Sequence, residues 1–486
     1  MRATRRRPST ILVALVVGAA VLAWPAGGAA QGSPPTVRLL SSGEDVTLYR
    51  IEGQVPLDLG VWVAAAGGDF ELRATRADYD APIVLSQTDA ATGDVVRDLS
   101  AVTVDGWSGV PRFIRVIARN QAGLIVRRRA FDFCPNASTW DRQRVDDSGP
   151  ELSRYPTSCA WYSPFTKGMV WGIDAGWATN ALGGSDFGFP TWRLPDGTYT
   201  FTVRITAPYR AMLEVPAAES EVSVPVTVKA APPGYFGQAR TDGAAPKATQ
   251  DFGVPDVDDP DPSTVPDLVA LPLWAMTTFS RRGKDYLSFA ATPWNAGPAP
   301  LVVEGFRRPG EDVMDAFQYF RDADGNVVGR APVGEMRFHP HPSHNHWHFL
   351  QFARFTLHDA ANMNVVRSRK QAFCLAPTDA IDLTVERASW APWNEIFTSC
   401  GTRTSLWVRE VLHTGWADTY YQWLPGQSFG ITSLRNGWYY ATIELNPLGS
   451  LYEVTTANNV ESRLVYLGGR PGARWVLSSP WHGIEP

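Results

Sequence analysis

Short runs in which apolar and polar residues alternate recur along most of the chain after its first thirty residues. Examples are Val46–Ile51, Arg112–Ala118 and Leu194–Ile205, the last of which opens with a Pro-Asp-Gly turn sequence. A period of two places successive side chains on opposite faces of a β-strand. The 42 glycines, 38 prolines and 19 tryptophans also suit strands and turns better than helices. The sequence therefore predicts a mainly β fold.

A chain of 486 residues is long enough for two or three domains with complete cores. We expect a β-sandwich-like domain of unassigned role over residues 31–229, a Pro/Asp/Gly-rich linker over 230–266, a second β-rich domain over 267–470 and a tail over 471–486. The acidic run that begins at Asp256 could hold calcium, but it lacks EF-hand spacing, so a solvated linker is the better interpretation.

The first thirty residues have the pattern of an export signal. Four arginines near the start precede an apolar run from Ile11 to Trp24, and the small residues Gly28, Ala29 and Ala30 offer a cleavage site. A retained membrane helix is the alternative, but the run is shorter than the roughly 20 apolar residues that a span needs. We therefore expect a secreted, extracellular protein with no stable membrane anchor after signal removal.

The charge balance disfavours a nucleic-acid partner. The chain has 44 basic and 49 acidic residues, a net charge of −5, and removal of four signal arginines leaves 40 against 49, or −9. An acidic surface could attract lysine-rich substrates, although a charge of this size usually serves solubility alone.

Four cysteines in an exported chain favour disulfides. Two local pairs, Cys134–Cys159 and Cys374–Cys400, keep each bridge within one expected domain. Metal–thiolate binding is the rival interpretation, but no Cys-x-x-Cys motif occurs.

Six of the eight histidines lie within twenty residues, namely His339, His341, His344, His346, His348 and His358. If the core, His344-Asn-His-Trp-His348, is extended, His344, His346 and His348 project from one face, and Leu350 and Phe352 continue that face as an apolar floor. Three convergent imidazoles suit copper, zinc, iron or nickel. A solvated histidine tract and individually satisfied core histidines are the alternatives. Spacing alone does not choose the metal.

The run His341-Pro-Ser-His344-Asn-His346-Trp-His348 resembles the copper motif of lysyl oxidases, whose last three histidines bind Cu(II). Lys370-Gln-Ala-Phe-Cys374-Leu is similar to the segment that carries the cofactor lysine of the family. The family order continues through the matching positions Asp267, Ala417-Asp418, Gln422-Trp423, Asn446-Pro447, Glu453 and Asn458-Asn459-Val460. The resemblance implies that residues 267–470 form a β-rich, lysyl oxidase-type copper domain.

The resemblance also implies a chemistry. In that family copper and O2 oxidise a tyrosine, which is cross-linked to the lysine as a lysine tyrosylquinone. The quinone converts primary amines, such as peptidyl lysine, to aldehydes with release of ammonia and peroxide. Copper(II), a lysine tyrosylquinone-type cofactor and a lysine-bearing or other primary-amine substrate are therefore expected, with Lys370 as half of the cofactor.

The chain departs from the family at the tyrosine. Gly415 occupies its position, so the candidate rings for the quinone are Tyr420, Tyr421 and, less plausibly, Trp416. A histidine that could act as base is replaced by Arg354, which leaves His413 as a nearby candidate, although a structural role suits His413 better.

Three functions stay open at this point. The first is an exported copper amine oxidase, with Lys370, Tyr420 and Tyr421 as candidate catalytic residues and His344, His346, His348 and His341 as candidate metal ligands. The second is a catalytically inactive copper-binding or structural relative, which Gly415 and Arg354 favour. The third is a different mononuclear copper oxidase, which no sequence feature supports specifically.

Overall fold

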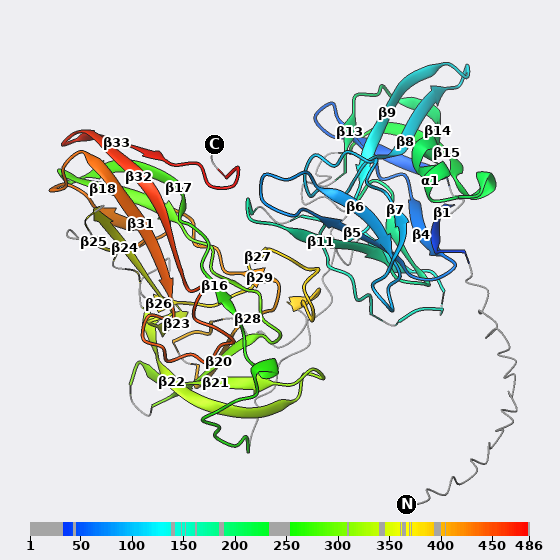
Figure 1. Ribbon diagram of the computed structural model, residues 1–486. Coiled ribbons are helices and arrows are strands. Elements are labelled where there is room, and N and C mark those ends of the chain that lie inside the picture. The colour runs from blue at the N-terminus through cyan, green and yellow to red at the C-terminus, as the bar shows by residue number, and fades with distance from the viewer. Residues whose placement is uncertain are drawn as a thin grey trace, which may run out of the picture. The chain divides into compact units, whose positions relative to one another are not determined.

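The computed structural model describes residues 33–41, 45–137, 141–146, 148–150, 152–160, 163–183, 189–232, 253–308, 311–339, 346–359, 361, 366–368, 370, 372–392, 400–403 and 405–484. The helical elements among them are α1 (Ala207–Met212) and the 3-10 turns η1 (Ala217–Glu219) and η2 (Pro262–Thr264), and the other regular elements are strands (Figure 1). The predicted mainly β fold is confirmed. Within these ranges no helix is long and apolar enough to cross a membrane. The expected signal segment, 1–30, lies outside them.

The strands before residue 231 form four sheets among themselves. Neighbouring strands are antiparallel except β2 and β15, which are parallel. As predicted, the first alternating run named above forms β2, the second lies within β8 and the third contains β14. The first sheet contains β1 (Thr36–Ser41), β4 (Val61–Ala66), β12 (Trp177–Asn180) and β10 (Arg142–Arg144). The second contains β11 (Gly168–Ile173), β5 (Phe70–Thr75), β6 (Val84–Thr88) and β7 (Val95–Asp98). The third is a pair of strands, β13 (Thr191–Trp192) and β3 (Val55–Pro56). The fourth contains β2 (Val46–Arg50), β15 (Glu221–Ala230), β14 (Gly197–Ile205), β8 (Val110–Asn120) and β9 (Ile125–Phe133).

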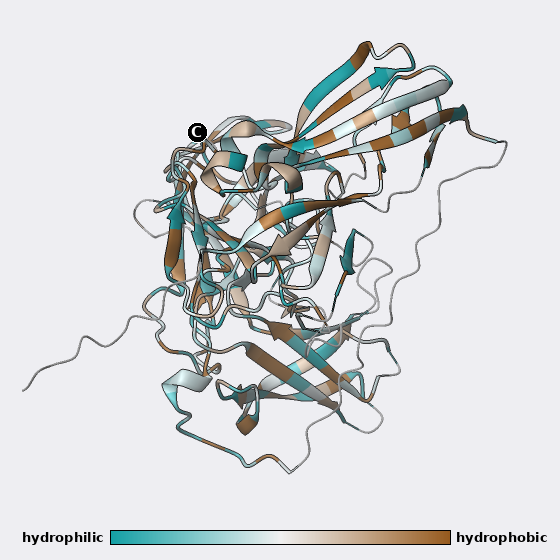
Figure 2. Ribbon diagram, turned by 90° about the vertical axis from the view of Figure 1, so that its right-hand side faces the viewer, coloured by the Kyte–Doolittle hydropathy of each residue, from teal (hydrophilic) through white to brown (hydrophobic). Residues whose placement is uncertain are grey.

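Alternation decides which side chains of these strands are buried. In β14, Tyr199, Phe201 and Val203 are buried, whereas Thr198 and Thr200 are exposed. Hydrophobic and hydrophilic bands alternate along several strands in Figure 2. Burial of the apolar set stabilises the sheets by roughly 25 cal/mol per Å² of apolar surface removed from water.

The predicted bridge between Cys134 and Cys159 is present. The buried Trp171 lies beside it and donates its indole N–H to the Cys159 carbonyl over 3.0 Å. The bridge thus belongs to the core of this part of the chain.

The strands after residue 267 form four further sheets. A six-stranded sheet runs in the order β26 (Ala372–Phe373), β23 (His346–Leu350), β22 (Val327–His339), β21 (Val313–Arg321), β20 (Leu301–Arg307) and β28 (Trp407–Leu412). A five-stranded sheet contains β25 (Val366–Arg367), β24 (Ala353–Asp359), β31 (Gly437–Leu445), β32 (Val460–Arg470) and β33 (Ala473–Ser478). A four-stranded sheet contains β16 (Leu268–Val269), β19 (Trp294–Asn295), β29 (Trp416–Ala417) and β27 (Asp379–Ala380). A three-stranded sheet contains β17 (Trp274–Arg281), β18 (Lys284–Ala290) and β30 (Ser428–Gly430).

Two segments expected to lie outside domains are tied to sheets where they are described. In the expected linker, backbone hydrogen bonds join Val257 N to Arg330 O over 2.8 Å and Arg330 N to Pro255 O over 3.0 Å. In the expected tail, β33 pairs with β32 over residues 473–478. The carboxylate of Asp256 forms an ion pair with Arg330, which accounts for one of the acids in the acidic run.

Candidate functional site

The histidine-bearing strand β23 lies between β22 and β26. Its register pairs His346 with His339 of β22 and Phe349 with Phe373 of β26. Trp347 and Phe349 are buried in the main core of the C-terminal sheets, so alternation turns His346 and His348 to the other face. The extended conformation predicted for the motif is therefore found from His346 onward.

The strand is shorter than expected. β23 ends at Leu350, because Gln351 has a φ of 62°, a left-handed conformation that interrupts a strand. Phe352 consequently does not continue the histidine face as an apolar floor; it is fully buried in the core and stacks edge-to-face on Phe373.

The imidazoles of this face lie close together. The ring centroids of His346 and His348 are 4.6 Å apart, and those of His339 and His348 are 5.7 Å apart. Burial, followed by the nearby Lys370 and His339, lowers the pKa of His346, which favours the neutral form that binds metals. His341 and His344 lie outside the described residues, and the described residues alone contain no cluster of three potential metal-binding side chains.

Lys370 is a buried amine two residues before β26. It is 6 % exposed, and its backbone N–H donates to Ser368 Oγ over 3.2 Å. Gly426 packs against it so closely that an added Cβ would lie 3.1 Å from the Lys370 Cβ. Desolvation lowers the pKa of Lys370 to about 8, and Asp418 opposes this shift. The position is therefore not that of an ordinary surface lysine.

The Tyr420 ring lies beneath this amine. Lys370 Nζ is 4.0 Å from the ring centroid of Tyr420 and 4.9 Å from that of Phe373. The Tyr420 hydroxyl accepts a hydrogen bond from Cys374 N over 3.0 Å and donates to Cys374 O over 2.9 Å. Cys374 is bonded to Cys400, as predicted. The disulfide segment thus fixes the hydroxyl end of the ring.

Two buried carboxyl groups complete the cluster. Asp418 follows β29, and Glu410 projects inward from β28 beside the core residues Val408 and Leu412. Desolvation raises the pKa of both carboxyls well above the usual range. One oxygen of each, Asp418 Oδ2 and Glu410 Oε1, has no hydrogen-bond partner among the described residues.

The other candidate rings lie elsewhere. Tyr421 stacks on Trp423 with centroids 4.6 Å apart and meets Trp274 edge-on at 6.0 Å. Trp416 is fully buried and donates its indole N–H to Ser389 O over 2.7 Å. Of the three candidate rings from the sequence, Tyr420 is the one in contact with Lys370.

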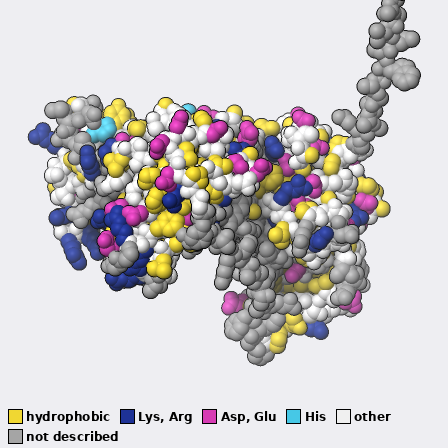
Figure 3. Space-filling model, turned by 90° about the horizontal axis from the view of Figure 1, so that it is seen from below, with side chains coloured by type: hydrophobic (Ala, Val, Ile, Leu, Met, Phe, Trp, Pro, Cys, Tyr) yellow, Lys and Arg dark blue, Asp and Glu magenta, His cyan; other side chains and the backbone are white. Residues whose placement is uncertain are grey.

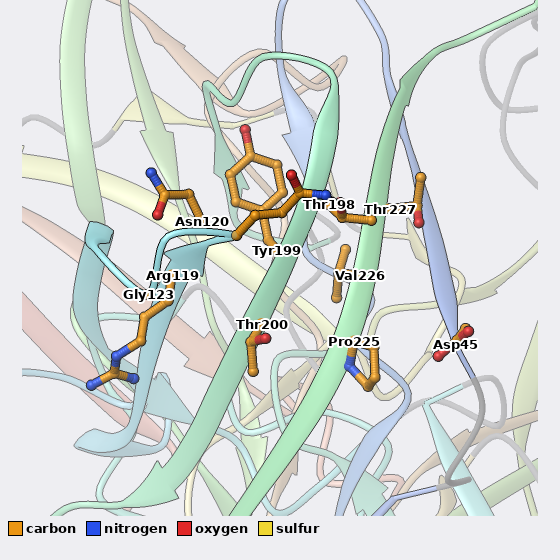
Figure 4. A pocket seen from close by; sticks show the side chains of 11 residues that line it. Asp45, Arg119, Asn120, Gly123, Thr198, Tyr199, Thr200, Pro225, Val226 and Thr227 are labelled. Carbon is orange, nitrogen blue, oxygen red and sulfur yellow. Dashed lines mark hydrogen bonds between the residues drawn. The ribbon is translucent and has the colours of Figure 1, made fainter.

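Two other surface features carry no comparable chemistry. An open pocket of about 500 Å³ on β8, β14 and β15 is lined by polar and apolar groups alike, among them Arg119, Thr198 and Val226 (Figure 4). Figure 3 shows basic side chains gathered at one end of the face it displays, with acidic ones among them. Among the described residues, arginines of β20 and β22 form ion pairs, for example Arg307 with Asp312 and Arg337 with Glu335.

Residues 323–473 match the family model for lysyl oxidase. This part of the chain belongs to the lysyl oxidase family. The match includes β23, Lys370 and Tyr420, and the family is one of copper- and quinone-dependent enzymes that act on amines. No curated protein matches the chain significantly.

Several positions that match the lysyl oxidase pattern meet in the structure. Asn446 and Asn459 each donate a side-chain N–H to Glu453 Oε1 over 2.7 Å. Asn458 donates to Asp267 Oδ1 over 3.0 Å, which ties the start of the domain to its last sheet. These matches are therefore explained as structural polar contacts within the domain.

The departures from the lysyl oxidase pattern are also built into the fold. Gly415 has a φ of 86°, its N–H donates to Asn295 O over 2.8 Å, and an added Cβ would lie 2.6 Å from Asp382 O. Arg354 forms an ion pair with Glu444 on the neighbouring strand β31. Gly415 has no space for a side chain, and the Arg354 guanidinium is paired with Glu444, so neither position supplies the group that the family has there.

The donor set fits the lysyl oxidase cofactors in two respects. Imidazoles gather on one face of β23, and a buried amine of low pKa lies over an oxidisable phenol. Sequence reasoning missed Asp418 and Glu410 as members of this site. Asp418 stands in a segment that matches the family, whereas Glu410 shows only as an acid in an otherwise apolar run, Trp407-Val-Arg-Glu-Val-Leu412.

Proposed function

We propose that this protein is an exported copper-dependent amine oxidase of lysyl oxidase type, which converts peptidyl lysine or small primary amines to aldehydes with release of ammonia and peroxide. The observation that carries the proposal is the buried contact of the Lys370 amine with the Tyr420 ring, 4.0 Å from Nζ to centroid. Tyr420 then replaces the tyrosine that is missing at Gly415.

His344, His346 and His348 would hold copper, with His341 contributing less. Once bound, copper supplies the oxidation of the tyrosine by O2, and the resulting quinone supplies a two-electron acceptor for the amine. Lys370 and Tyr420 would be its two halves.

The remaining residues have positioning roles. Ser368 Oγ accepts from Lys370 N and donates to Gly426 O over 2.5 Å, which holds the lysine backbone. The Cys374 peptide fixes the Tyr420 hydroxyl. Because the Lys370 pKa is lowered to about 8, roughly a tenth of the amine is neutral and nucleophilic at pH 7, far more than for an exposed lysine.

The test is the cofactor itself. Copper-loaded protein matured in air is treated with phenylhydrazine, which gives a coloured adduct with a quinone, and its peptides are mapped by mass spectrometry. We expect the adduct and a peptide in which Lys370 is joined covalently to Tyr420. Recovery of Lys370 as an unmodified peptide from fully copper-loaded protein would contradict the proposal.

A second function keeps the copper site without the quinone. The observation that favours it is Gly415, whose conformation and surroundings leave no place for the family tyrosine. In that case the protein binds copper through the same histidines but gives no phenylhydrazine adduct, and it is a copper-binding or structural relative of the oxidases.

A further inference from the structure

Amine oxidation requires a base that removes a proton from the carbon beside the amine nitrogen. Neither the position of the replaced family histidine, Arg354, nor the candidate base His413 suits this role. Arg354 is ion-paired with Glu444. His413 lines a separate pocket of about 320 Å³ with Arg321 and Arg387, and burial, aided by Arg321, lowers its pKa to about 3. Neither Lys370 nor Tyr420 lines that pocket.

Asp418 is the acidic side chain that touches the Lys370–Tyr420 contact. It is 2 % exposed, and the Tyr420 hydroxyl and the Ala376 amide are among the groups close enough to its carboxyl to lower its pKa. Its Oδ2 has no partner among the described residues, although it is shielded from solvent. Leaving a buried oxygen without a hydrogen-bond partner costs free energy, so its presence calls for an explanation. A catalytic role is one such explanation.

The charges that face Asp418 set its proton affinity. Desolvation raises its pKa most, Lys370 and the Tyr420 hydroxyl lower it, and Asp379 raises it. Glu410 is electrostatically coupled to Asp418 but points its Oε2 at Leu375 N, 2.9 Å away. Catalytic carboxyls that exchange protons near neutral pH have such desolvated surroundings.

We propose that Asp418 is the general base of the amine oxidation, an inference that rests on the proposed function. The carbon–hydrogen bond next to the amine nitrogen breaks, and its proton binds Asp418 Oδ2. The quinone would supply the two-electron acceptor for the electron pair of that bond. Dioxygen later takes these two electrons together with two protons and leaves as peroxide. Asp418 returns its proton before the next turnover.

The first test uses Asp418→Asn, which keeps the size of the side chain but cannot take a proton. Copper-loaded wild type and variant are compared for phenylhydrazine adduct and for anaerobic reduction by benzylamine and its α,α-dideuterated form. We expect the variant to keep the adduct and to be reduced about 10²–10⁴-fold more slowly, with a larger deuterium isotope effect. Glu453→Gln, which removes a carboxyl that accepts hydrogen bonds from Asn446 and Asn459 outside this cluster, should leave the reduction rate within tenfold of wild type.

Two outcomes would overturn the inference. Reduction of the Asp418→Asn protein at a rate within tenfold of wild type, per adduct-forming site, shows that another group takes the proton. Loss of the adduct in this variant places Asp418 in formation of the cofactor instead of turnover.

A second test is independent of the cofactor. The infrared spectrum of copper-free Glu410→Gln protein should contain a protonated-carboxyl band that is insulated from solvent and disappears as the pH rises, and this band should be absent when Asp418 is also replaced by Asn. Its absence from Glu410→Gln protein at every pH would mean that Asp418 never binds a proton and would refute the inference. If wild type forms no adduct, the proposed function has failed, whereas the band still reports on Asp418 separately.

Discussion

The Lys370 amine lies 4.0 Å from the centre of the Tyr420 ring, although the two residues are fifty positions apart in the sequence. The contact is made in the core, with Phe373 edge-on to Tyr420 at 4.8 Å. A cation over a ring face attracts the ring, and in a desolvated site such a contact is worth about 2 kcal/mol. The same contact places the amine beside the only oxidisable phenol that the structure brings to it among the candidate rings.

Tyr420→Phe is expected to abolish the quinone, because phenylalanine keeps the ring but lacks the phenol oxygen that oxidation requires. Tyr421→Phe is the matched control, since Tyr421 is packed against Trp423 and Trp274. The measurement is the phenylhydrazine adduct per bound copper in air-matured protein. A full yield of adduct in Tyr420→Phe, or its loss only in Tyr421→Phe, would assign the precursor to a different ring.

Lys370 is expected to titrate near pH 8 in copper-free protein. The sequence has five lysines, Lys167, Lys229, Lys247, Lys284 and Lys370, so ¹³C-lysine NMR resolves them individually. Lys370 has its pKa lowered to about 8 by desolvation, against about 10.4 for an exposed lysine. Asp418→Asn should lower the Lys370 pKa further, because it removes the charge that favours the ammonium.

The same shift has a consequence for stability. Between pH 8 and the pKa of the unfolded lysine, the unfolded chain binds more protons than the folded one at this group, so the Lys370 contribution to the free energy of unfolding rises with pH across that window. Below pH 8 the folded chain also carries the ammonium, so the full cost of burying this charge lowers the free energy of unfolding. Lys370→Met should therefore flatten this part of the stability–pH curve, whereas Lys284→Met, at an exposed position, should not.

Local patterns in the sequence predicted the strands, both disulfides and the shared face of His346 and His348, because each depends on residues close together or on composition. The cluster around Lys370 depends on tertiary pairing. Asp418 approaches Lys370, and Glu410 approaches Asp418, only after β26 and β28 have become the two edges of the six-stranded sheet and β29 has joined the four-stranded sheet. The early end of β23 at Gln351 also escaped prediction, because nothing in the residue type requires a φ of 62°.

Copper binding is expected to depend on His346. Removal of this imidazole from the face of β23 leaves the site one nitrogen short, so His346→Ala should lose most of its copper after dialysis at pH 7, as measured by metal analysis. His358→Ala is the control, because His358 lies on β24 and bonds Thr442 instead, with Nε2 to Oγ1 at 3.1 Å. Unchanged copper stoichiometry in His346→Ala would refute the three-histidine assignment.

The Cys374–Cys400 bridge is expected to affect both stability and the site. It closes a loop with a sequence separation of 26, for which loss of a disulfide costs about 2–4 kcal/mol of unfolding free energy. Since Cys374 holds the Tyr420 hydroxyl through its peptide group, a Cys374→Ser/Cys400→Ser protein should also form less quinone.

The other bridge provides the comparison. Cys134–Cys159 has a sequence separation of 25, so its removal should cost a similar free energy of unfolding. It lies beside Trp171 and away from the Tyr420 hydroxyl in the chain, so the quinone yield per folded molecule should stay at the wild-type level. Equal losses of quinone in both double variants would show that the effect is general destabilisation.

Gly415→Tyr restores the residue of the family at its usual position, and we nevertheless expect it to form no cofactor through that ring. The position has a φ of 86°, and its Cβ would lie 2.6 Å from the Asp382 carbonyl oxygen and 3.1 Å from Ala388 Cβ. The backbone is held there from both sides, because Gly415 O accepts hydrogen bonds from Ile381 N and Asp382 N over 2.9 and 3.1 Å.

Even the smallest side chain should therefore be costly. Gly415→Ala combines a left-handed backbone with a close contact to the main chain, so we expect a loss of more than about 1–3 kcal/mol in unfolding free energy by chemical denaturation. Gly283→Ala is the control for backbone strain alone, because Gly283 has a φ of 72° but nothing within 4 Å of its added Cβ. If Gly415→Ala costs no more than Gly283→Ala, or if Gly415→Tyr/Tyr420→Phe protein gives a phenylhydrazine adduct, the site can accept the family tyrosine and Tyr420 is not its replacement.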